Sequence, residues 1–312
     1  MRATSMHEAY RGLLCEIMNH GVEEVNARTG VRIKMLRGGH SFKLRLDEDL
    51  RLPVAGNRRY YPHVAAAETA WQFMGTKDPS FIVGKAPKLW SKFVEIETTH
   101  VGTVSTQKEV LKTAYGWRWR EAFGRDQIAL TLDELANNPT NRQLFISAWD
   151  PSSDGLGGPQ PKNIPCPVGF CVSRFEDELH MSVFIRSSDV FVGLPYDTMC
   201  YALTLDAFAA TLGCKPGTLT MTMAHPHIYE PHFSSANACL FGLDRVACVD
   251  LEKERGRYEG ASTEWTGNVR PSLPAWTVDQ IVTRPDDYVD AVKLLAGRVN
   301  RNTWDPYPEL IE

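Results

Sequence analysis

Side chains that could carry out nucleophilic chemistry on a bound anion lie between residues 165 and 229. Cys166 stands between two prolines, where a polar loop gives way to a β-rich run. A thiol in such an open position can act as a nucleophile when a nearby cation stabilises its charge. Arg186-Ser187 follows a strand rich in β-branched and aromatic residues, and guanidinium and hydroxyl groups bind phosphate. The pattern therefore indicates covalent catalysis on a substrate that carries a negative charge.

The other cysteines have a simpler interpretation. The chain contains seven cysteines, and a free cysteine is more often a packing residue than a nucleophile. Cys200 and Cys214 lie on or just after an apolar helical pattern, so we interpret them as structural. An odd number of cysteines without regular spacing favours a reducing compartment, where thiols stay free.

Three histidines near the end of this region could suggest a metal site. His225, His227 and His232 do not follow the spacing of a standard zinc motif, and the strand context favours a role in binding substrate. The sequence therefore predicts no metal.

The elements that must position these residues follow from hydrophobic periodicity and from glycine and proline signals. Helices are predicted over 6–19, 62–74, 126–137 and 197–212, and Gly213 ends the last of them. Strands are predicted over 31–36, 41–46, 142–149 and 219–229, with two more after a loop at 150–162. A hairpin-like turn at Arg37-Gly38-Gly39 is predicted to join the first two strands. Strands interspersed with helices indicate an α+β or mixed layered fold.

Composition limits the function classes. With 312 residues and 43% hydrophobic content the chain can bury a large core, and we expect one domain over 1–312. The formal net charge of −4 gives no support for a nucleic-acid-binding surface. The N-terminus does not read as a signal peptide, and no apolar run approaches the roughly 20 residues that span a bilayer. We expect a cytoplasmic enzyme.

Four motifs, in order and spacing, resemble those of the thymidylate synthases and their pyrimidine hydroxymethylase relatives. The motifs are Pro165-Cys166, Arg186-Ser187-Ser188-Asp189, Gly193-Leu194-Pro195-Tyr196-Asp197 and His227-Ile228-Tyr229. In that family they carry the nucleophile, bind phosphate and folate, read the base and bind the sugar hydroxyl. Other matches lie upstream, at Ala27-Arg28-Thr29-Gly30, Glu68, Trp90, Tyr115-Gly116 and 126–149. The resemblance covers about residues 20 to 235, and Asp305-Pro306-Tyr307-Pro308 is similar to the family's C-terminal segment.

The resemblance implies a fold, an assembly and a set of roles. It implies one domain with a large mixed β-sheet packed with helices, in a homodimer formed through a face of the sheet. The implied catalytic residues are Cys166, Glu68, Tyr115 and Asp197. Those implied to bind a pyrimidine nucleoside monophosphate are Arg28, Arg142 from the second subunit, Arg186, Ser187, Asp197, His227 and Tyr229. Trp90, Asp189 and Gly193 are implied to bind the co-substrate, 5,10-methylenetetrahydrofolate.

Asp197 is the departure that changes the predicted substrate. Thymidylate synthases have asparagine there, and its amide matches the donor and acceptor of uracil. Cytosine presents an amino donor beside an unprotonated N3. An aspartate accepts from the amino group and, when protonated, supplies a proton to N3. Family hydroxymethylases that act on cytidylate have aspartate at this position, so we predict a deoxycytidylate (dCMP) 5-hydroxymethylase.

Further departures concern the surroundings of the base and the phosphate. Gln143 replaces one of two adjacent family arginines, so the predicted phosphate-binding site has one positive charge fewer than in the family. Pro167 and Ile185 replace polar residues and indicate a rearranged hydrogen-bond network near the base. The ending at 309–312, with Glu309 and Glu312, differs from the family's apolar ending, which favours water over hydride in the last step.

Alternatives stay open at this point. A CMP 5-hydroxymethylase of nucleoside biosynthesis differs from the dCMP enzyme only around the sugar 2′ position. A thymidylate synthase is possible if Asp197 tolerates uracil. An inactive homologue that binds nucleotide or RNA is a third reading, against which the intact set of Cys166, Glu68 and Arg186 argues. The sequence does not distinguish phage DNA modification in an infected host from antibiotic biosynthesis in a bacterial cell.

Overall fold

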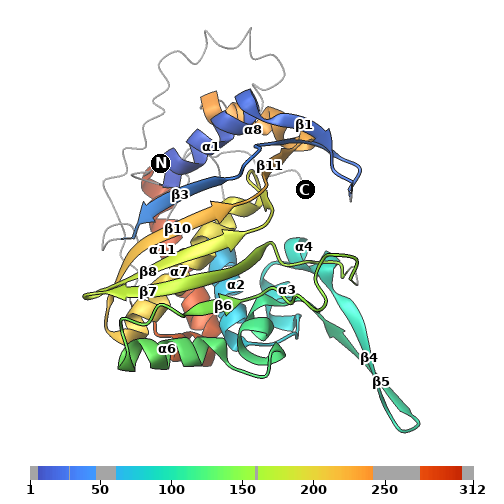
Figure 1. Ribbon diagram of the computed structural model, residues 1–312, viewed down its shortest axis with the longest axis vertical. Coiled ribbons are helices and arrows are strands. Elements are labelled where there is room, and N and C mark those ends of the chain that lie inside the picture. The colour runs from blue at the N-terminus through green and yellow to red at the C-terminus, as the bar shows by residue number, and fades with distance from the viewer. Residues whose placement is uncertain (1–5, 28, 47–60, 159–160, 242–274, 304–312) are drawn as a thin grey trace.

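A five-stranded mixed sheet forms the centre of the protein (Figure 1). The computed structural model describes residues 6–27, 29–46, 61–158, 161–241 and 275–303. The strand order is β3-β10-β8-β7-β6, with β10 parallel to β8 and the other neighbours antiparallel. The strands are β3 (His40–Arg45), β6 (Phe145–Ser147), β7 (Pro167–Phe175), β8 (Glu178–Ile185) and β10 (Lys215–Met223).

A second sheet of four strands continues from the first where the chain bends. Its order is β1-β2-β11-β9, with β1 (Val22–Val25), β2 (Arg32–Met35), β9 (Ser188–Asp189) and β11 (Pro226–Tyr229). The backbone bonds Ala224 N to Ile185 O (2.9 Å) and Ser188 N to His225 O (3.1 Å) join the two sheets at the bend. This bend brings the ends of β8 and β10 next to β9 and β11.

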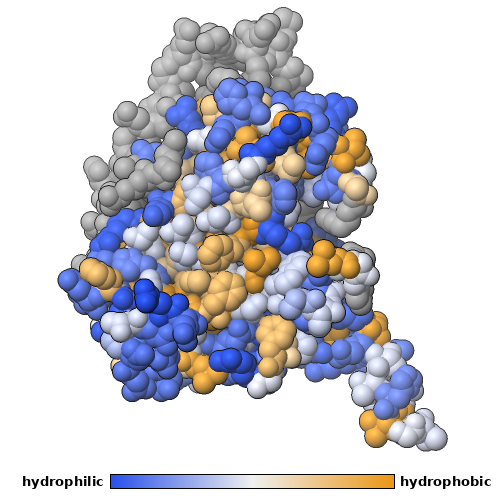
Figure 2. Space-filling model, in the orientation of Figure 1, coloured by the Kyte–Doolittle hydropathy of each residue, from blue (hydrophilic) through white to orange (hydrophobic). Residues whose placement is uncertain are grey.

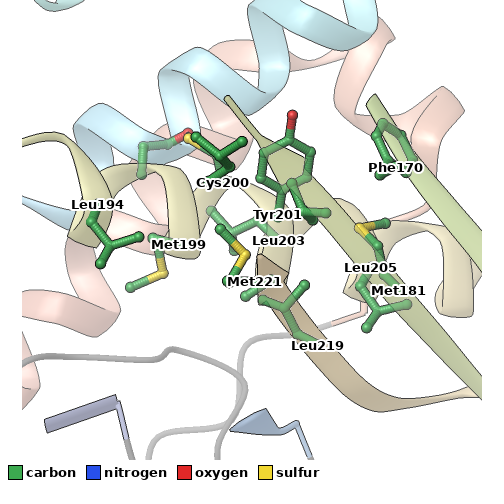
Figure 3. Packing of buried hydrophobic residues seen from close by; sticks show 14 of the residues in the cluster. Phe170, Met181, Leu194, Met199, Cys200, Tyr201, Leu203, Leu205, Leu219 and Met221 are labelled. Atoms are coloured by element: carbon green, nitrogen blue, oxygen red, sulfur yellow. The ribbon is translucent and has the colours of Figure 1, made fainter. Parts of the chain in front are cut away.

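Three helices stack in order on one face of the five-stranded sheet (Figure 1). Helix α7 (Gly193–Leu212) packs on β8 and β10, α2 (Pro62–Met74) packs on α7, and α11 (Pro285–Thr303) packs on α2. Because α7 lies between the sheet and α2, it is apolar around its whole circumference, as expected for a central helix. Figure 3 shows its side chains among those of the sheet.

The remaining elements surround this core. The other helices are α1 (Met6–His20), α3 (Ser80–Lys85), α4 (Pro87–Trp90), α5 (Tyr115–Trp117), α6 (Gln127–Asn137), α8 (Phe233–Phe241) and α10 (Val278–Thr283), and a π-helical turn follows α5 at Arg118–Ala122. The hairpin β4 (Glu95–Val101) and β5 (Val104–Val110) projects away from the body (Figure 1). Within the described residues, no helix is both long and apolar enough to cross a membrane.

The predicted α+β class is confirmed, and most helices lie where periodicity placed them. Helices α1, α2 and α6 agree with the predictions to within one residue at each end, and Asp126 caps α6 by accepting a hydrogen bond from Ala129 N (2.9 Å). Gly213 ends α7 with φ +63°, as predicted, but the helix begins four residues earlier, at Gly193. Thus the Gly193-Leu194-Pro195 motif forms the first turn of α7.

Three strand predictions need correction. The turn at residues 37–39 does not form a hairpin, because β2 pairs with β1 and β11 while β3 pairs with β10 in the other sheet. The predicted strand at 142–149 is only three residues long and lies at the sheet edge, with Phe145 47% exposed. The predicted strand at 219–229 is two strands, β10 and β11, interrupted at the bend.

The face of the five-stranded sheet opposite α7 carries exposed aromatic side chains. Phe145 and Phe184 lie on it with ring centroids 6.2 Å apart and exposed fractions of 47% and 38%. Figure 2 shows hydrophobic residues gathered over the centre of this face.

Candidate active site

Cys166 lies at the entrance of β7, and its backbone is held on both sides. Its N–H donates to Tyr115 Oη (3.2 Å), and its carbonyl accepts from Arg186 N (2.9 Å). The thiol is partly buried and lies 3.8 Å from Arg186 Nη2. The candidate nucleophile therefore has a fixed backbone and a cation beside its sulfur, an arrangement that stabilises a thiolate.

Arg186 follows β8 and ties the segment before Cys166 to the sheet. Its Nε donates to Pro165 O (2.8 Å) and its Nη2 to Ile164 O (3.0 Å). The guanidinium also lies over the Trp149 ring, 5.8 Å from the centroid, a distance at which cation–π attraction operates. Arg186 is thus oriented by its neighbours before any ligand binds.

Glu68 is a carboxylic acid inside an almost fully buried helix. It lies in the middle of α2 with 7% of its surface exposed, and Trp90 Nε1 donates to its Oε1 (2.8 Å). Burial raises the pKa of Glu68 to about 7, although the hydrogen bonds from Trp90 and Cys200 oppose the rise. A carboxyl group with such a pKa can both accept and release a proton near neutral pH.

Asp197 lies one turn into α7, close enough to Glu68 for the two charges to interact. Burial is the largest cause that raises its pKa to about 7, followed by the charges of Glu68 and Asp189. A Cβ placed on Gly193 would lie 3.8 Å from Asp197 Oδ2 and 3.9 Å from Asp189 Cβ, so Gly193 separates these two acids. The negative charges of Glu68 and Asp197 therefore disfavour each other, so a proton is more easily retained on this pair of acids.

Tyr115 completes the surroundings of the thiol. Burial, and then the charges of Cys166 and Asp197, raise the pKa of Tyr115 well above its ordinary value, so the phenol stays neutral. The next residue, Gly116, lies against α2 so closely that an added Cβ would be 1.9 Å from Gln72 O. Glycine at 116 thus lets the short helix α5 bring Tyr115 next to the helix that carries Glu68.

The bend between the two sheets holds buried polar atoms that lack partners. His227 is 5% exposed, and its Nδ1 lies 3.0 Å from His225 O, which leaves Nε2 as an acceptor. Within the described part of the chain, neither His227 Nε2 nor Ser188 Oγ has a hydrogen-bond partner. Parallel pairing of β9 with β11 sets Asp189 opposite His227, and the Tyr229 ring packs edge-on against His227 at 5.0 Å.

The structure brings together most, but not all, of the predicted site residues. The directly connected groups are Cys166 with Tyr115 and Arg186, Glu68 with Trp90, Asp197 with Gly193 and Asp189, and His227 with Tyr229. Ser187 is half-buried next to Arg186. Arg142 is exposed in the segment between α6 and β6, and no described contact joins it to this group. Arg28, like residues 305–312, lies outside the described residues.

Two residues of the site were not predicted from the sequence. Trp149, which stacks on Arg186, was read only as the end of a strand. Cys200 was interpreted as a packing residue, yet its Sγ lies 3.5 Å from Glu68 Oε2. The sequence signal that could have indicated this contact is the position of Cys200 three residues after Asp197, because residues i and i+3 lie on the same face of a helix.

The arrangement supports covalent chemistry with proton transfer among buried and partly buried side chains. It offers a thiol beside a guanidinium, two carboxyl groups that titrate near neutrality and a neutral phenol. Across the residues that the structure describes, no group of three or more His, Cys, Asp or Glu side chains is placed to hold a metal ion.

Comparison with known protein families gives one match over most of the chain. The family model described as Thymidylate synthase matches residues 8–249. The matched range contains all the residues of the candidate site, from Glu68 on α2 to Tyr229 on β11.

Proposed function

The chain belongs to the thymidylate synthase family, whose members transfer a one-carbon unit from 5,10-methylenetetrahydrofolate to a pyrimidine nucleotide, and on that premise we propose that it is a deoxycytidylate 5-hydroxymethyltransferase. The reaction converts dCMP, 5,10-methylenetetrahydrofolate and water to 5-hydroxymethyl-dCMP and tetrahydrofolate. It proceeds through a covalent bond between Cys166 Sγ and C6 of the pyrimidine.

The observation that carries the proposal is the aspartate in the base-reading motif. With a pKa raised to about 7, Asp197 can enter the reaction protonated and give its proton to cytosine N3 as the thiolate adds at C6. The carboxylate that results has two acceptors facing two donors, N3–H and the N4 amino group. With uracil, negative charge would develop on O4 as the thiolate adds, and the Asp197 carboxylate would repel that charge. Aspartate therefore stabilises the cytosine adduct selectively.

The other residues around Cys166 have complementary roles. Arg186 stabilises the thiolate and, with Ser187, binds the phosphate. Attack at C6 makes C5 nucleophilic, which splits a difficult substitution into two easier steps. Glu68, titrating near neutrality, moves protons and orients the water that completes the product. Tyr115 fixes the Cys166 backbone and supports proton transfer at C5.

The unpartnered acceptor at the bend supports the binding of a nucleotide sugar. A buried polar atom without a partner costs free energy, about 1–3 kcal/mol, and a sugar hydroxyl that donates to His227 Nε2 would remove that cost. Tyr229, packed on the His227 ring, supports the same contact. This assigns the sugar to the bend and the base to the start of α7.

Folate is proposed to bind on the Glu68 side of the pocket. The residues fit a flat heterocycle with N–H donors, because the Trp90 ring adjoins Glu68 and the Asp189 side chain lies near Gly193. The bound co-substrate supplies the one-carbon unit. Trp90, Asp189 and Gly193 hold and orient it, while the apolar pair Pro167 and Ile185, opposed in neighbouring strands, excludes water beside the thiol.

The active form is proposed to be a homodimer with sites completed across subunits. Arg142 is exposed and lacks described contacts with the other site residues, which suits a residue that binds phosphate in the neighbouring subunit. The exposed aromatic face of the five-stranded sheet, with Phe145 and Phe184, supplies a surface for the subunit contact. The phosphate cradle then contains Arg186, Ser187, Arg28 and Arg142 of a second copy.

One incubation series tests the substrate and the reaction together. Wild-type protein and Asp197→Asn are each incubated with dCMP, CMP and dUMP plus 5,10-methylenetetrahydrofolate, and products are analysed by mass spectrometry. We expect 5-hydroxymethyl-dCMP from wild type. In Asp197→Asn the preference should move toward dUMP by roughly tenfold or more, since each mismatched polar group costs about 1–3 kcal/mol.

The control is Asp290→Asn, the same change at an exposed position of α11, which should leave the preference unchanged. Conversion of CMP instead of dCMP would establish the ribonucleotide hydroxymethylase. A methylated product from dUMP in wild type would establish a thymidylate synthase, and nucleotide binding without turnover would establish an inactive homologue. Any of these three results would overturn the proposal.

A further inference from the structure

A second donor to Glu68 lies on the side opposite Trp90. Cys200 Sγ is 3.5 Å from Glu68 Oε2 and 3.5 Å from Ala65 O, so its hydrogen can be directed at either oxygen. The side chain is 3% exposed and lies among the apolar residues of α7 (Figure 3). Each carboxylate oxygen of Glu68 thus has its own donor, the Trp90 indole at 2.8 Å and the Cys200 thiol.

The two donors differ greatly in strength. An indole N–H is a good hydrogen-bond donor, whereas a thiol S–H is a weak one with a long contact distance. Burial, followed by the charges of Glu68 and Asp197, raises the pKa of Cys200 well above its ordinary value, so the thiol keeps its proton. It therefore acts as a neutral, weak donor and not as a competing anion.

We propose that Cys200 is a positioning residue that sets the proton affinity of Glu68 by offering only a weak hydrogen bond to Oε2, an inference that rests on the proposed proton-transfer role of Glu68. A stronger donor at this place would stabilise the carboxylate and make Glu68 a poorer base. Removal of the donor would leave Oε2 unpaired and make the group harder to ionise. With the thiol in place, the proton affinity of Glu68 lies between the value expected with a stronger donor and the value expected with no donor.

The other titratable groups packed around this pair bear on the same equilibrium. Asp197 on α7 interacts electrostatically with both Glu68 and Cys200. Tyr288 on α11 interacts electrostatically with Cys200 and stays neutral, because burial and then Asp206 and Cys200 raise its pKa well above the ordinary value. Tyr201 on α7 also stays neutral, because burial and the charges of Tyr115, Asp197 and Cys200 raise its pKa. The pKa of Asp197 is raised to about 7, as that of Glu68 is, so an experiment must separate these two acids.

Infrared titration of the nucleotide-free protein distinguishes the ionisation of Glu68 from that of Asp197. The protein is labelled with ¹³C-glutamate, and the carbonyl stretch of protonated glutamate is followed from pH 5 to 9. The band that disappears in Glu68→Gln is assigned to Glu68. The variants are Cys200→Ser and Cys200→Ala, and the matched control is Cys214→Ser, the same change just after α7. Circular dichroism verifies that each variant is folded.

We expect the proton affinity of Glu68 to fall about three- to tenfold in Cys200→Ser, because a hydroxyl donates to a carboxylate more strongly than a thiol. In Cys200→Ala it should rise roughly threefold, and in Cys214→Ser it should not change. The limb of the pH–rate profile assigned to Glu68 should move by the same factors. The alanine variant, which introduces no polar group, decides the question if the serine variant does not fold.

An unchanged titration of Glu68 in both Cys200→Ala and a folded Cys200→Ser would overturn the inference. The infrared measurement needs no substrate, so its failure is distinct from failure of the proposed function. If the Glu68 band moves as expected but dCMP is not hydroxymethylated, then the proposed reaction is wrong and the link between Cys200 and Glu68 stands.

Discussion

Replacing Glu68 by glutamine should stabilise the folded protein above neutral pH while it destroys activity. Burial raises the pKa of Glu68 from 4.5 to about 7, a difference that corresponds to about 3 kcal/mol of free energy of unfolding. Because this pKa is raised, the folded state binds the proton more tightly than the unfolded state. The carboxyl group is protonated in both states below about pH 4.5, so it costs no stability there.

The cost of the buried charge grows as pH rises from 4.5 to about 7 and then stays constant. Glutamine never ionises and escapes this cost, and its amide oxygen can still accept from Trp90 Nε1. At pH 8 we therefore expect Glu68→Gln to be more stable than wild type by about 3 kcal/mol, or roughly 6 °C in Tm for a chain of this size. At pH 5 the cost is only about 0.8 kcal/mol, so the two proteins should differ by about 2 °C.

Thermal unfolding at pH 5 and pH 8 checks this expectation, with protein concentration held constant because the Tm of the proposed dimer would depend on it. Glu109→Gln, the same substitution at an exposed position of β5, is the control and should not change Tm appreciably at either pH. Turnover of Glu68→Gln should fall by about 100-fold or more. A Tm difference that is equal at both pH values, or a loss of stability at pH 8, would refute the reasoning.

Three further predictions test other parts of the site. Cys166→Ser should abolish turnover but leave nucleotide binding, measured by calorimetry, largely intact, whereas Cys171→Ser should be nearly harmless; product formation by the first variant would exclude the covalent mechanism. Mixing inactive Cys166→Ser with inactive Arg142→Ala subunits should restore up to about a quarter of wild-type activity, since one hybrid site receives both intact residues; no recovery after verified subunit exchange would place each site within one chain. Trp90→Phe removes the indole donor to Glu68, so the pKa of that carboxyl should rise above about 7 and the pH–rate limb should move to higher pH; an unmoved limb would contradict the assigned hydrogen bond.

The sequence predicted the helices well because their periodicity and end signals are local. Pro62 at the first position of α2 and Gly213 at the end of α7 mark ends that the structure reproduces. Strand pairing was harder, because the turn at residues 37–39 looks the same locally whether it joins two paired strands or passes between two sheets. Gly39 shows the difference only in three dimensions, where an added Cβ would lie 2.5 Å from Met223 O.

The sequence predicted the site residues that belong to motifs. It did not predict the properties of those residues that arise from burial in the folded protein. The motifs of Cys166 and Arg186 marked both residues as site residues, and the structure places Arg186 Nη2 3.8 Å from Cys166 Sγ. The raised pKa values of Glu68 and Asp197 depend on how completely α2 and α7 enclose them, which residue types alone do not reveal. The contact of Cys200 with Glu68 was not predicted for the same reason, because it depends on how α7 packs against α2.

The contact between Gly116 and Gln72 has a consequence for redesign of the enzyme. Since an added Cβ would meet the backbone of Gln72 there, direct contact fixes the separation of the backbones of α5 and α2. In the proposed enzyme, base recognition depends instead on the side chain at position 197 of α7. A substitution at 197 can therefore change which pyrimidine is accepted without moving these two helices, whereas any residue larger than glycine at 116 would push α5, with Tyr115, away from the helix that carries Glu68.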